Sequence, residues 1–153
     1  MIRGIFITGL LLATIGLTSM RFDNLKVLNY VKLAVIVNSE TAPLALDMRG
    51  LRTLLRGEKQ RWKDGTKITL AFMKTSTDVG SDMSTRVFGK TEKELNKYFL
   101  AKVFQGKMSS PEFFDSEVDL RSFVKSTKGA ISVISATNSS GFKTILIDGK
   151  KSF

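Results

Sequence analysis

The sequence contains no cysteine and no histidine among its 153 residues. Without cysteine the chain has no disulfide bonds, no thiolate metal site and no lipid attachment through cysteine. The absence of histidine removes the usual metal ligand and the usual general base, so a Ser-His-Asp triad or Cys-His pair is excluded. The Walker A lysine pattern and the G-x-G-x-x-G pattern are also missing. We predict a protein that is not an enzyme and that needs no cofactor.

A cation site has little support in the sequence. Asp78 and Asp82 bracket the pair Gly80-Ser81 and are the right chemistry for a hard cation. Two carboxylates beside a helix start are more often caps of that helix. We therefore predict no metal site.

The net charge is +10, from 24 basic and 14 acidic residues. Such a balance suits anionic partners: phosphate-like ligands, nucleic acid or an acidic membrane face. The charges are spread over every segment, which is also typical of a basic but ordinary surface. No cluster of aromatic and basic residues accompanies them, so we predict no specific nucleic-acid partner.

The first residues have the layout of a secretory signal. A basic start with Arg3 precedes an apolar run over residues 5–17, which is short for a membrane span. No A-x-A cleavage pattern follows, so an uncleaved anchor and a buried N-terminal helix stay open. We assign residues 1–19 to a signal peptide or an uncleaved N-terminal anchor. The predicted location is periplasmic or secreted, with a membrane tether if the signal is retained.

The remaining residues have the length of one ordinary domain, which we place at residues 31–153. Short apolar runs predict four buried strands. The first is nearly continuous and rich in β-branched residues, as in a parallel strand that is covered on both faces. The four predicted strands span residues 31–37, 67–73, 130–135 and 143–147.

Capping signals predict the helices between these strands. Asp47 is a plausible N-cap, Thr91 and Glu94 form a capping box, and Ser116 is a further cap. A short helix is predicted to open at Gly80-Ser81, with Met83, Val87 and Phe88 on its inner face. Phe104 is expected to flank the buried face of the helix that follows. The element order β-α-β-α-α-α-β-β predicts an α/β fold with a mixed, mostly parallel sheet covered by helices.

The loop before the short helix is the best candidate for a ligand site. A helix start presents unpaired backbone N–H groups and a partial positive charge, which together favour an anion. Polar residues 74–79 lead into Gly80-Ser81. The alternative is an ordinary turn and N-cap without a ligand.

Several motifs follow one another in a familiar order. Residues 54–59 read LLRGEK, Trp62-x-Asp64-Gly65 follows, and after a strand come Gly80-Ser81 and Phe88. This set resembles the phosphate-binding proteins of ABC importers. Short, single-domain relatives of those proteins are more similar still, since residues 104–106 (FQG) and 129–131 (GAI) also match their pattern. The resemblance covers residues 31–135.

The resemblance implies one lobe of a type-2 periplasmic-binding-protein fold. It further implies an exported protein that binds phosphate or a similar small anion and is associated with an ABC-type uptake system. Gly80 and Ser81 match the Gly-Ser of the family's anion loop, and Ser39 falls near its first hydroxyl contact. The hydroxyls of Thr75, Ser76 and Thr77 complete the implied anion site. The expected partners are the anion and a membrane transporter or other periplasmic protein, and the expected state is a monomer.

Departures from the pattern keep a second function open. Lys74 stands near the position of an arginine in full-length phosphate binders, and lysine lacks the bidentate fork that matches phosphate. Asp82 would oppose an incoming anion, and Ser132-Val133 replaces a Gly-Tyr pair. The length suffices for one lobe only. The alternative is therefore a periplasmic accessory or protein-interaction module of the same fold without tight ligand binding.

Overall fold

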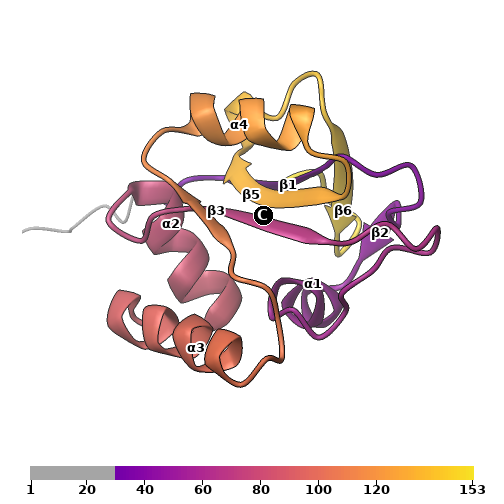
Figure 1. The fold of residues 1–153 in the computed structure, drawn as a ribbon. Helices are drawn as coiled ribbons and strands as arrows, with labels where there is room; N and C mark the ends of the chain where they lie inside the picture. The colour runs from indigo at the N-terminus through magenta and orange to yellow at the C-terminus, as the bar shows by residue number, and fades with distance from the viewer. Residues whose placement is uncertain (1–29) are drawn as a thin grey trace, which may run out of the picture.

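The computed structural model describes residues 30–153, so the predicted signal in residues 1–19 lies outside the described part. A six-stranded sheet in the order β2-β6-β1-β5-β3-β4 runs through the centre of that part (Figure 1). Within residues 30–153, no helix combines the length and the apolar character needed to cross a membrane. The strands are β1 (Leu33–Val37), β2 (Ala45–Leu46), β3 (Thr69–Met73), β4 (Glu112–Phe114), β5 (Ala130–Ser135) and β6 (Lys143–Ile147).

The sheet is mixed and mostly parallel, as predicted. The parallel neighbours are β2 with β6, β3 with β4 and β3 with β5. β1 is antiparallel to both of its neighbours, β5 and β6. The four predicted strands are present. β2 and β4 were not predicted, because segments of two and three residues carry no readable apolar period.

The direction expected for β1 was wrong. All five of its residues are buried, as its apolar run predicted. Yet Val37 is paired with Ile131 and Leu33 with Ser135, which is an antiparallel register. A continuous apolar run shows that both faces of a strand are covered, and it carries no information about the direction of the neighbouring strands.

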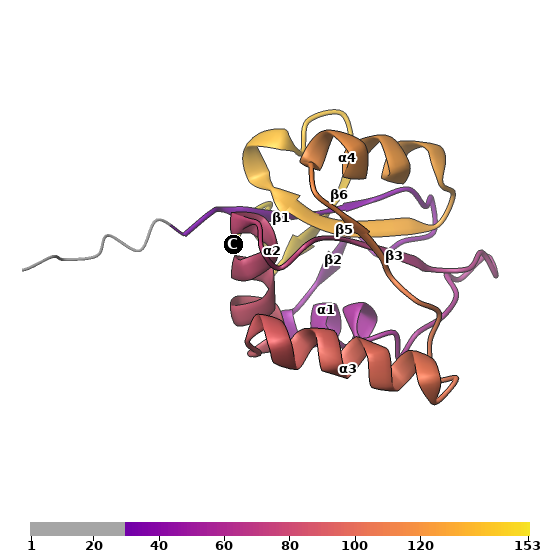
Figure 2. The same ribbon diagram turned by 60° about the vertical axis from the view of Figure 1, so that its left-hand side comes forward.

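Helices cover both faces of the sheet. α4 lies on one face, whereas α1 and α3 lie on the other (Figures 1 and 2). α2 continues directly into a π-helical turn, η1 (Met83–Phe88), whose apolar residues are buried as predicted. The helices are α1 (Met48–Leu55), α2 (Asp78–Asp82), α3 (Glu92–Phe104) and α4 (Glu117–Ser126), with a short 3-10 turn at Ala136–Asn138.

Three of the predicted N-caps are confirmed. Asp47 Oδ1 accepts the Gly50 N–H at 2.7 Å, and Ser116 Oγ accepts the Asp119 N–H at 3.1 Å. The capping box at α3 is complete, because the Thr91 N–H also donates to Glu94 Oε2 at 2.8 Å. That hydrogen bond to the backbone lowers the pKa of Glu94.

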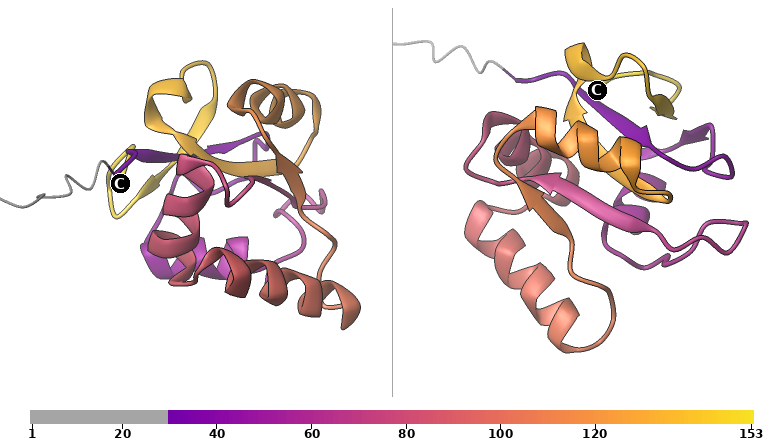
Figure 3. Two further views of the ribbon diagram at one scale, coloured as in Figure 1. Left: turned by 90° about the vertical axis from the view of Figure 1, so that its left-hand side faces the viewer. Right: turned by 45° about the horizontal axis from the view of Figure 1, so that its top comes forward.

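An aromatic cluster joins α3 to the sheet. The Phe72 ring of β3 stacks on Phe99 of α3 with centroids 5.5 Å apart, and Phe88 meets both rings edge-on. Leu95 and Phe99 are buried as predicted. Phe104 is 83% exposed, because the last turn of α3 runs beyond the sheet edge (Figure 3).

Candidate functional site

The helix at the predicted anion loop starts earlier than predicted. Thr77 is its N-cap, with Oγ1 accepting the Gly80 N–H at 3.1 Å. The same hydroxyl donates to the Lys74 carbonyl at 2.7 Å. Gly80 and Ser81 therefore lie inside the first turn of α2 rather than at its opening. Both hydrogen bonds of Thr77 are to residues three positions away. The cap could therefore have been predicted from the sequence, because a threonine three residues before Gly80 is a typical N-cap.

Gly80 is required by the approach of α2 to the end of β3. A Cβ atom added at Gly80 would lie 2.0 Å from the Lys74 carbonyl oxygen and 2.8 Å from the Met73 carbonyl oxygen. Neither atom belongs to a movable side chain. The glycine therefore has a structural reason to be present, whether or not an anion binds beside it.

The loop between β3 and α2 carries free backbone donors. The structure records no acceptor within residues 30–153 for the N–H groups of Thr75, Ser76, Asp78 and Val79. Two of these belong to the first turn of α2, where no intrahelical acceptor exists. The exposed hydroxyl of Ser76 accompanies them, whereas Thr75 is buried, with 6% of its surface exposed. Five of the six predicted site residues thus lie on one continuous segment, residues 75–81.

Ser39 does not join that segment. It follows the carboxyl end of β1, which pairs with the amino end of β5. Because β5 is parallel to β3, β1 and β3 run in opposite directions, and their carboxyl ends point to opposite ends of the sheet along the strand direction. The expectation that Ser39 and Ser81 share one anion site is therefore corrected. It assumed that β1 was parallel to β3, as in an open parallel sheet.

The loop after β1 has its own internal bonds. Lys143 donates from Nζ to the carbonyls of Ser39, Glu40 and Ala42 at 3.0, 2.8 and 3.2 Å. The Ser39 hydroxyl lies 3.4 Å from Thr41 Oγ1. Sequence reasoning missed Lys143, since nothing local links a lysine to carbonyls about a hundred residues earlier. The lysine ties this loop to β6.

The charges around residues 74–81 do not favour an anion. Lys74 forms an ion pair with Asp115 at 2.7 Å, and both side chains are largely exposed. Asp78 contributes a further negative charge at the start of α2, whereas Asp82 lies 3.7 Å from Arg86 Nη1 and is balanced by it. The single nearby lysine is therefore already balanced, and an anion would meet a net negative surrounding.

Asp82 has a structural function that the sequence did not reveal. Its Oδ2 accepts the Val31 N–H at 2.7 Å and lies 3.7 Å from Arg86 Nη1. The Arg86 guanidinium lies 5.6 Å from the Tyr30 ring centroid and 5.7 Å from that of Phe153. The Asp82–Arg86 pair thus holds the residues just before β1 next to Phe153. Within the described residues, no group of three His, Cys, Asp or Glu side chains could hold a metal ion.

Comparison with solved structures identifies the fold. An ABC-type phosphate transport receptor from Vibrio cholerae superposes with a TM-score of 0.62 at 14% identity, over 80% of this chain and 49% of that one. PstS from Borrelia burgdorferi gives 0.58 at 21% identity, over 78% and 48%. A Clostridium perfringens substrate-binding protein that holds bound phosphate gives 0.58 at 14%, over 78% and 46%. The chain has the fold of phosphate ABC transporter substrate-binding proteins.

The resemblance in the sequence is confirmed at the level of this substrate-binding-protein fold. The chain spans about half the length of the solved structures it matches. No family model matches the chain, and no curated protein matches its sequence. The neighbours are named as transport receptors and binding proteins, and their identities of 14–21% establish the shared fold alone.

Within this fold the Trp62 turn is part of the core. Trp62 is 3% exposed, and its indole N–H donates to the Gly129 carbonyl at 3.0 Å. The turn is closed by the Trp62 N–H to the Thr66 carbonyl at 2.8 Å. Asp64 accepts the Thr66 N–H at 3.0 Å, and this bond lowers the pKa of the Asp64 carboxyl. The motif thus links the turn before β3 to the start of β5.

Proposed function

We propose that this chain is an anion-binding domain that takes phosphate or a similar small anion at residues 75–81. One observation carries the proposal: four backbone N–H groups in this loop lack an acceptor within residues 30–153. Anions bind readily to such groups at the start of a helix. The shared fold with phosphate transport receptors supports the same assignment. We propose further that the chain is periplasmic and delivers the anion to an ABC transporter.

The expected affinity is low. The Lys74–Asp115 and Arg86–Asp82 pairs are each balanced, and the Asp78 carboxylate leaves no net positive charge beside the loop. Ser76, Asp78 and Ser81 are exposed to water, where each charge contact is worth only about 1 kcal/mol. We expect a dissociation constant on the order of 1 mM, which corresponds to about 4 kcal/mol of binding free energy.

Titration of the 15N-labelled protein with phosphate at constant ionic strength tests this site. The amide signals of residues 75–79 are expected to shift and to saturate. Asp78→Asn removes one negative charge at the first position of α2, so binding should tighten about fivefold. Glu92→Gln is the matched control, because Glu92 occupies the same position of α3 behind a threonine cap.

The control variant should bind as the wild type does. Shifts that never saturate, or that spread evenly over the basic surface, would indicate ionic screening and contradict the proposal. An unchanged dissociation constant in Asp78→Asn would contradict the position of the site, even if phosphate bound elsewhere.

A second candidate function rests on an exposed apolar patch. We define the α3–β4 patch by Leu100, Val103, Phe104 and Phe113. Leu100 is 59% exposed and Phe104 83% exposed. Leu100, Val103 and Phe113 line one groove of about 180 Å³ beside β4, which is an edge strand of the sheet. Apolar patches and open strand edges are features of protein contacts, and this supports the interaction-module alternative.

Phe104→Ala tests this alternative. Because the side chain is exposed, the free energy of unfolding should change by no more than about 0.5 kcal/mol. A transport protein that co-purifies with the wild type and is identified by mass spectrometry should be lost from the variant. Val118→Ala is the matched control, since Val118 is 73% exposed on α4, on the opposite face. Equal recovery with all three proteins would exclude the patch as the contact.

A further inference from the structure

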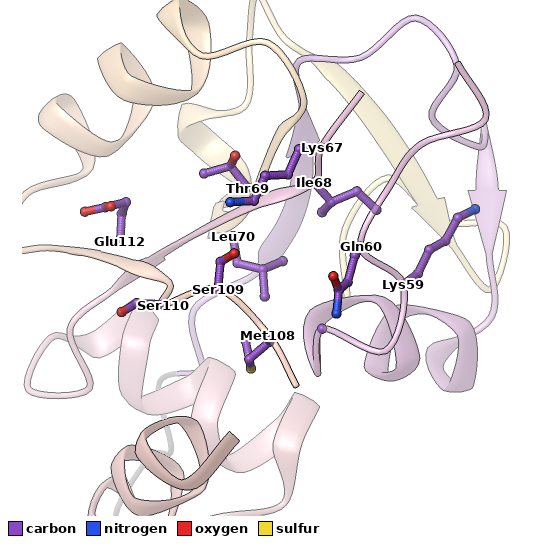
Figure 4. Close-up of a pocket in the computed structure, with 11 residues that line it drawn as sticks. Lys59, Gln60, Lys67, Ile68, Thr69, Leu70, Met108, Ser109, Ser110 and Glu112 are labelled. Atoms are coloured by element: carbon purple, nitrogen blue, oxygen red, sulfur yellow. The ribbon is translucent and has the colours of Figure 1, made fainter. Parts of the chain in front are cut away.

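A cavity lies at the amino end of β3, away from the anion loop of residues 75–81. It has a volume of about 120 Å³. Three segments line it: the turn after α1, residues 67–70 at the start of β3, and the connection from α3 to β4 with the first residue of β4 (Figure 4). None of the six predicted site residues contributes to its lining. This cavity is therefore separate from the proposed anion loop.

The sheet register explains why the cavity exists. The ladder between β3 and β4 begins at Ala71 paired with Glu112, so Leu70 has no partner residue in β4. The Thr69 N–H donates to Gly129 on the β5 side, whereas the Lys74 N–H donates to Phe114 on the β4 side. Backbone groups alternate between the two sides along a strand. The Leu70 N–H consequently points to the side of the cavity, where the ladder has not yet begun.

The walls of the cavity are held by contacts between distant segments. Gln60 Nε2 donates to the Lys107 carbonyl at 2.9 Å and ties the turn after α1 to the connection after α3. A Cβ atom added at Gly57 would lie 2.9 Å from the Met108 Cβ, which shows how closely these two segments approach. Ile68, Leu70 and Met108 are each more than nine-tenths buried and form an apolar floor.

Polar groups lie beside this floor at the open edge of β3, where Thr69 projects from the face of the strand opposite to Leu70. Lys67, Thr69 and Ser109 line the cavity, and Figure 4 shows the Lys67 ammonium on the side of Thr69. The carboxylate of Glu112 points away from Ser109 in the same view. Within residues 30–153, Lys67 forms no ion pair. Lys59 also lines the cavity, but Figure 4 shows its ammonium directed away from Lys67 and Thr69, and the Ser110 hydroxyl donates to the Pro111 carbonyl at 3.3 Å. The cavity thus offers the Lys67 ammonium, the hydroxyls of Thr69 and Ser109, the Leu70 N–H and an apolar floor.

We propose that this cavity binds a small carboxylate with a short apolar body. The carboxylate would accept hydrogen bonds from Lys67, the two hydroxyls and the Leu70 N–H, while the body lies on Ile68 and Met108. With only the Lys67 ammonium directed toward Thr69, the site matches a monoanion, and a charge-assisted bond to Lys67 is the strongest contact in the set. An apolar floor suits an aliphatic chain, which a carboxylate such as propionate carries and phosphate lacks.

Propionate is the probe, with propionamide as its uncharged counterpart. In a titration of the 15N-labelled protein, propionate should shift the amides of Thr69, Leu70 and Ser109 with saturation, and propionamide should not. Lys67→Gln should weaken propionate binding about tenfold. Lys63→Gln is the matched control, because Lys63 is exposed in the preceding turn and does not line the cavity.

Three outcomes would overturn the assignment: no saturable shift with propionate, equal binding by Lys67→Gln and the wild type, or phosphate shifting these amides at lower concentration than propionate. Lys67 is exposed, so its substitution should leave the fold intact, and the unchanged amide spectrum outside the cavity verifies this. The amides of residues 75–79 report separately on the anion loop. If one of the two sites binds no ligand, binding at the other can therefore still be measured from its own amide signals.

Discussion

Gly80→Ala is expected to lower the free energy of unfolding by about 3 kcal/mol or more, a large part of the stability of a typical domain. The new Cβ atom would meet the Lys74 carbonyl oxygen at 2.0 Å. Since the obstacle is backbone, α2 must move away from the end of β3. That movement would uncover Val79, which is buried against the core. Urea denaturation followed by circular dichroism measures the loss.

Gly50→Ala is the matched control for this variant. Gly50 also occupies the third position of its helix, and its N–H is bound by the cap side chain of Asp47. An added Cβ atom would meet only side-chain atoms, Asp47 Oδ1 at 3.0 Å and Leu46 Cδ2 at 3.2 Å. Alanine is also the better helix former by about 1 kcal/mol. The control should stay within about 1 kcal/mol of the wild type, and an equal loss in both variants would contradict the close approach of α2 to β3.

Trp62→Ala is expected to lower the free energy of unfolding by about 3–5 kcal/mol. The indole is buried between the turn after α1 and the start of β5, and its removal leaves a cavity there. Trp62→Phe should cost less, about 1–3 kcal/mol, because most of the apolar surface is kept. The Gly129 carbonyl would retain one donor, the Thr69 N–H at 3.2 Å.

Phe104→Ala provides the comparison for Trp62→Ala, since it also truncates an aromatic residue but at an exposed position. Denaturation by urea should separate the two variants by at least about 2 kcal/mol. If Trp62→Ala were as stable as Phe104→Ala, the result would contradict the burial of the indole between the turn after α1 and the start of β5. The distinction matters because Trp62 belongs to the motif set that resembles phosphate binders, and its role here is to hold the fold.

Much of the local structure could be predicted from the sequence. Hydrophobic runs located four strands, and the side chains of Asp47, Thr91 and Ser116 located three helix starts. Each of these signals lies within a few residues of the element it specifies. The α2 cap was misplaced by a few residues, because the Gly-Ser pair was preferred to Thr77 as the helix start.

The candidate site was only partly predictable, for a non-local reason. Residues 75–81 stay together in any fold because they are contiguous, whereas Ser39 could join them only if β1 and β3 were parallel. The charge balance at Lys74 depends on Asp115, about forty residues later. Such partners meet through pairing of distant segments, which a local pattern does not specify.

The sequence by itself determined the α/β class, the four longer strands, most helix caps and the motif order from residue 54 to residue 88. The tertiary structure decided the direction of β1, the separation of Ser39 from the anion loop and the backbone contact that requires Gly80. It also created the cavity at the amino end of β3, where the ladder with β4 begins only at Ala71. The physical reason is that caps and apolar periods act over a few residues, whereas strand direction and close approach are set by packing between distant segments.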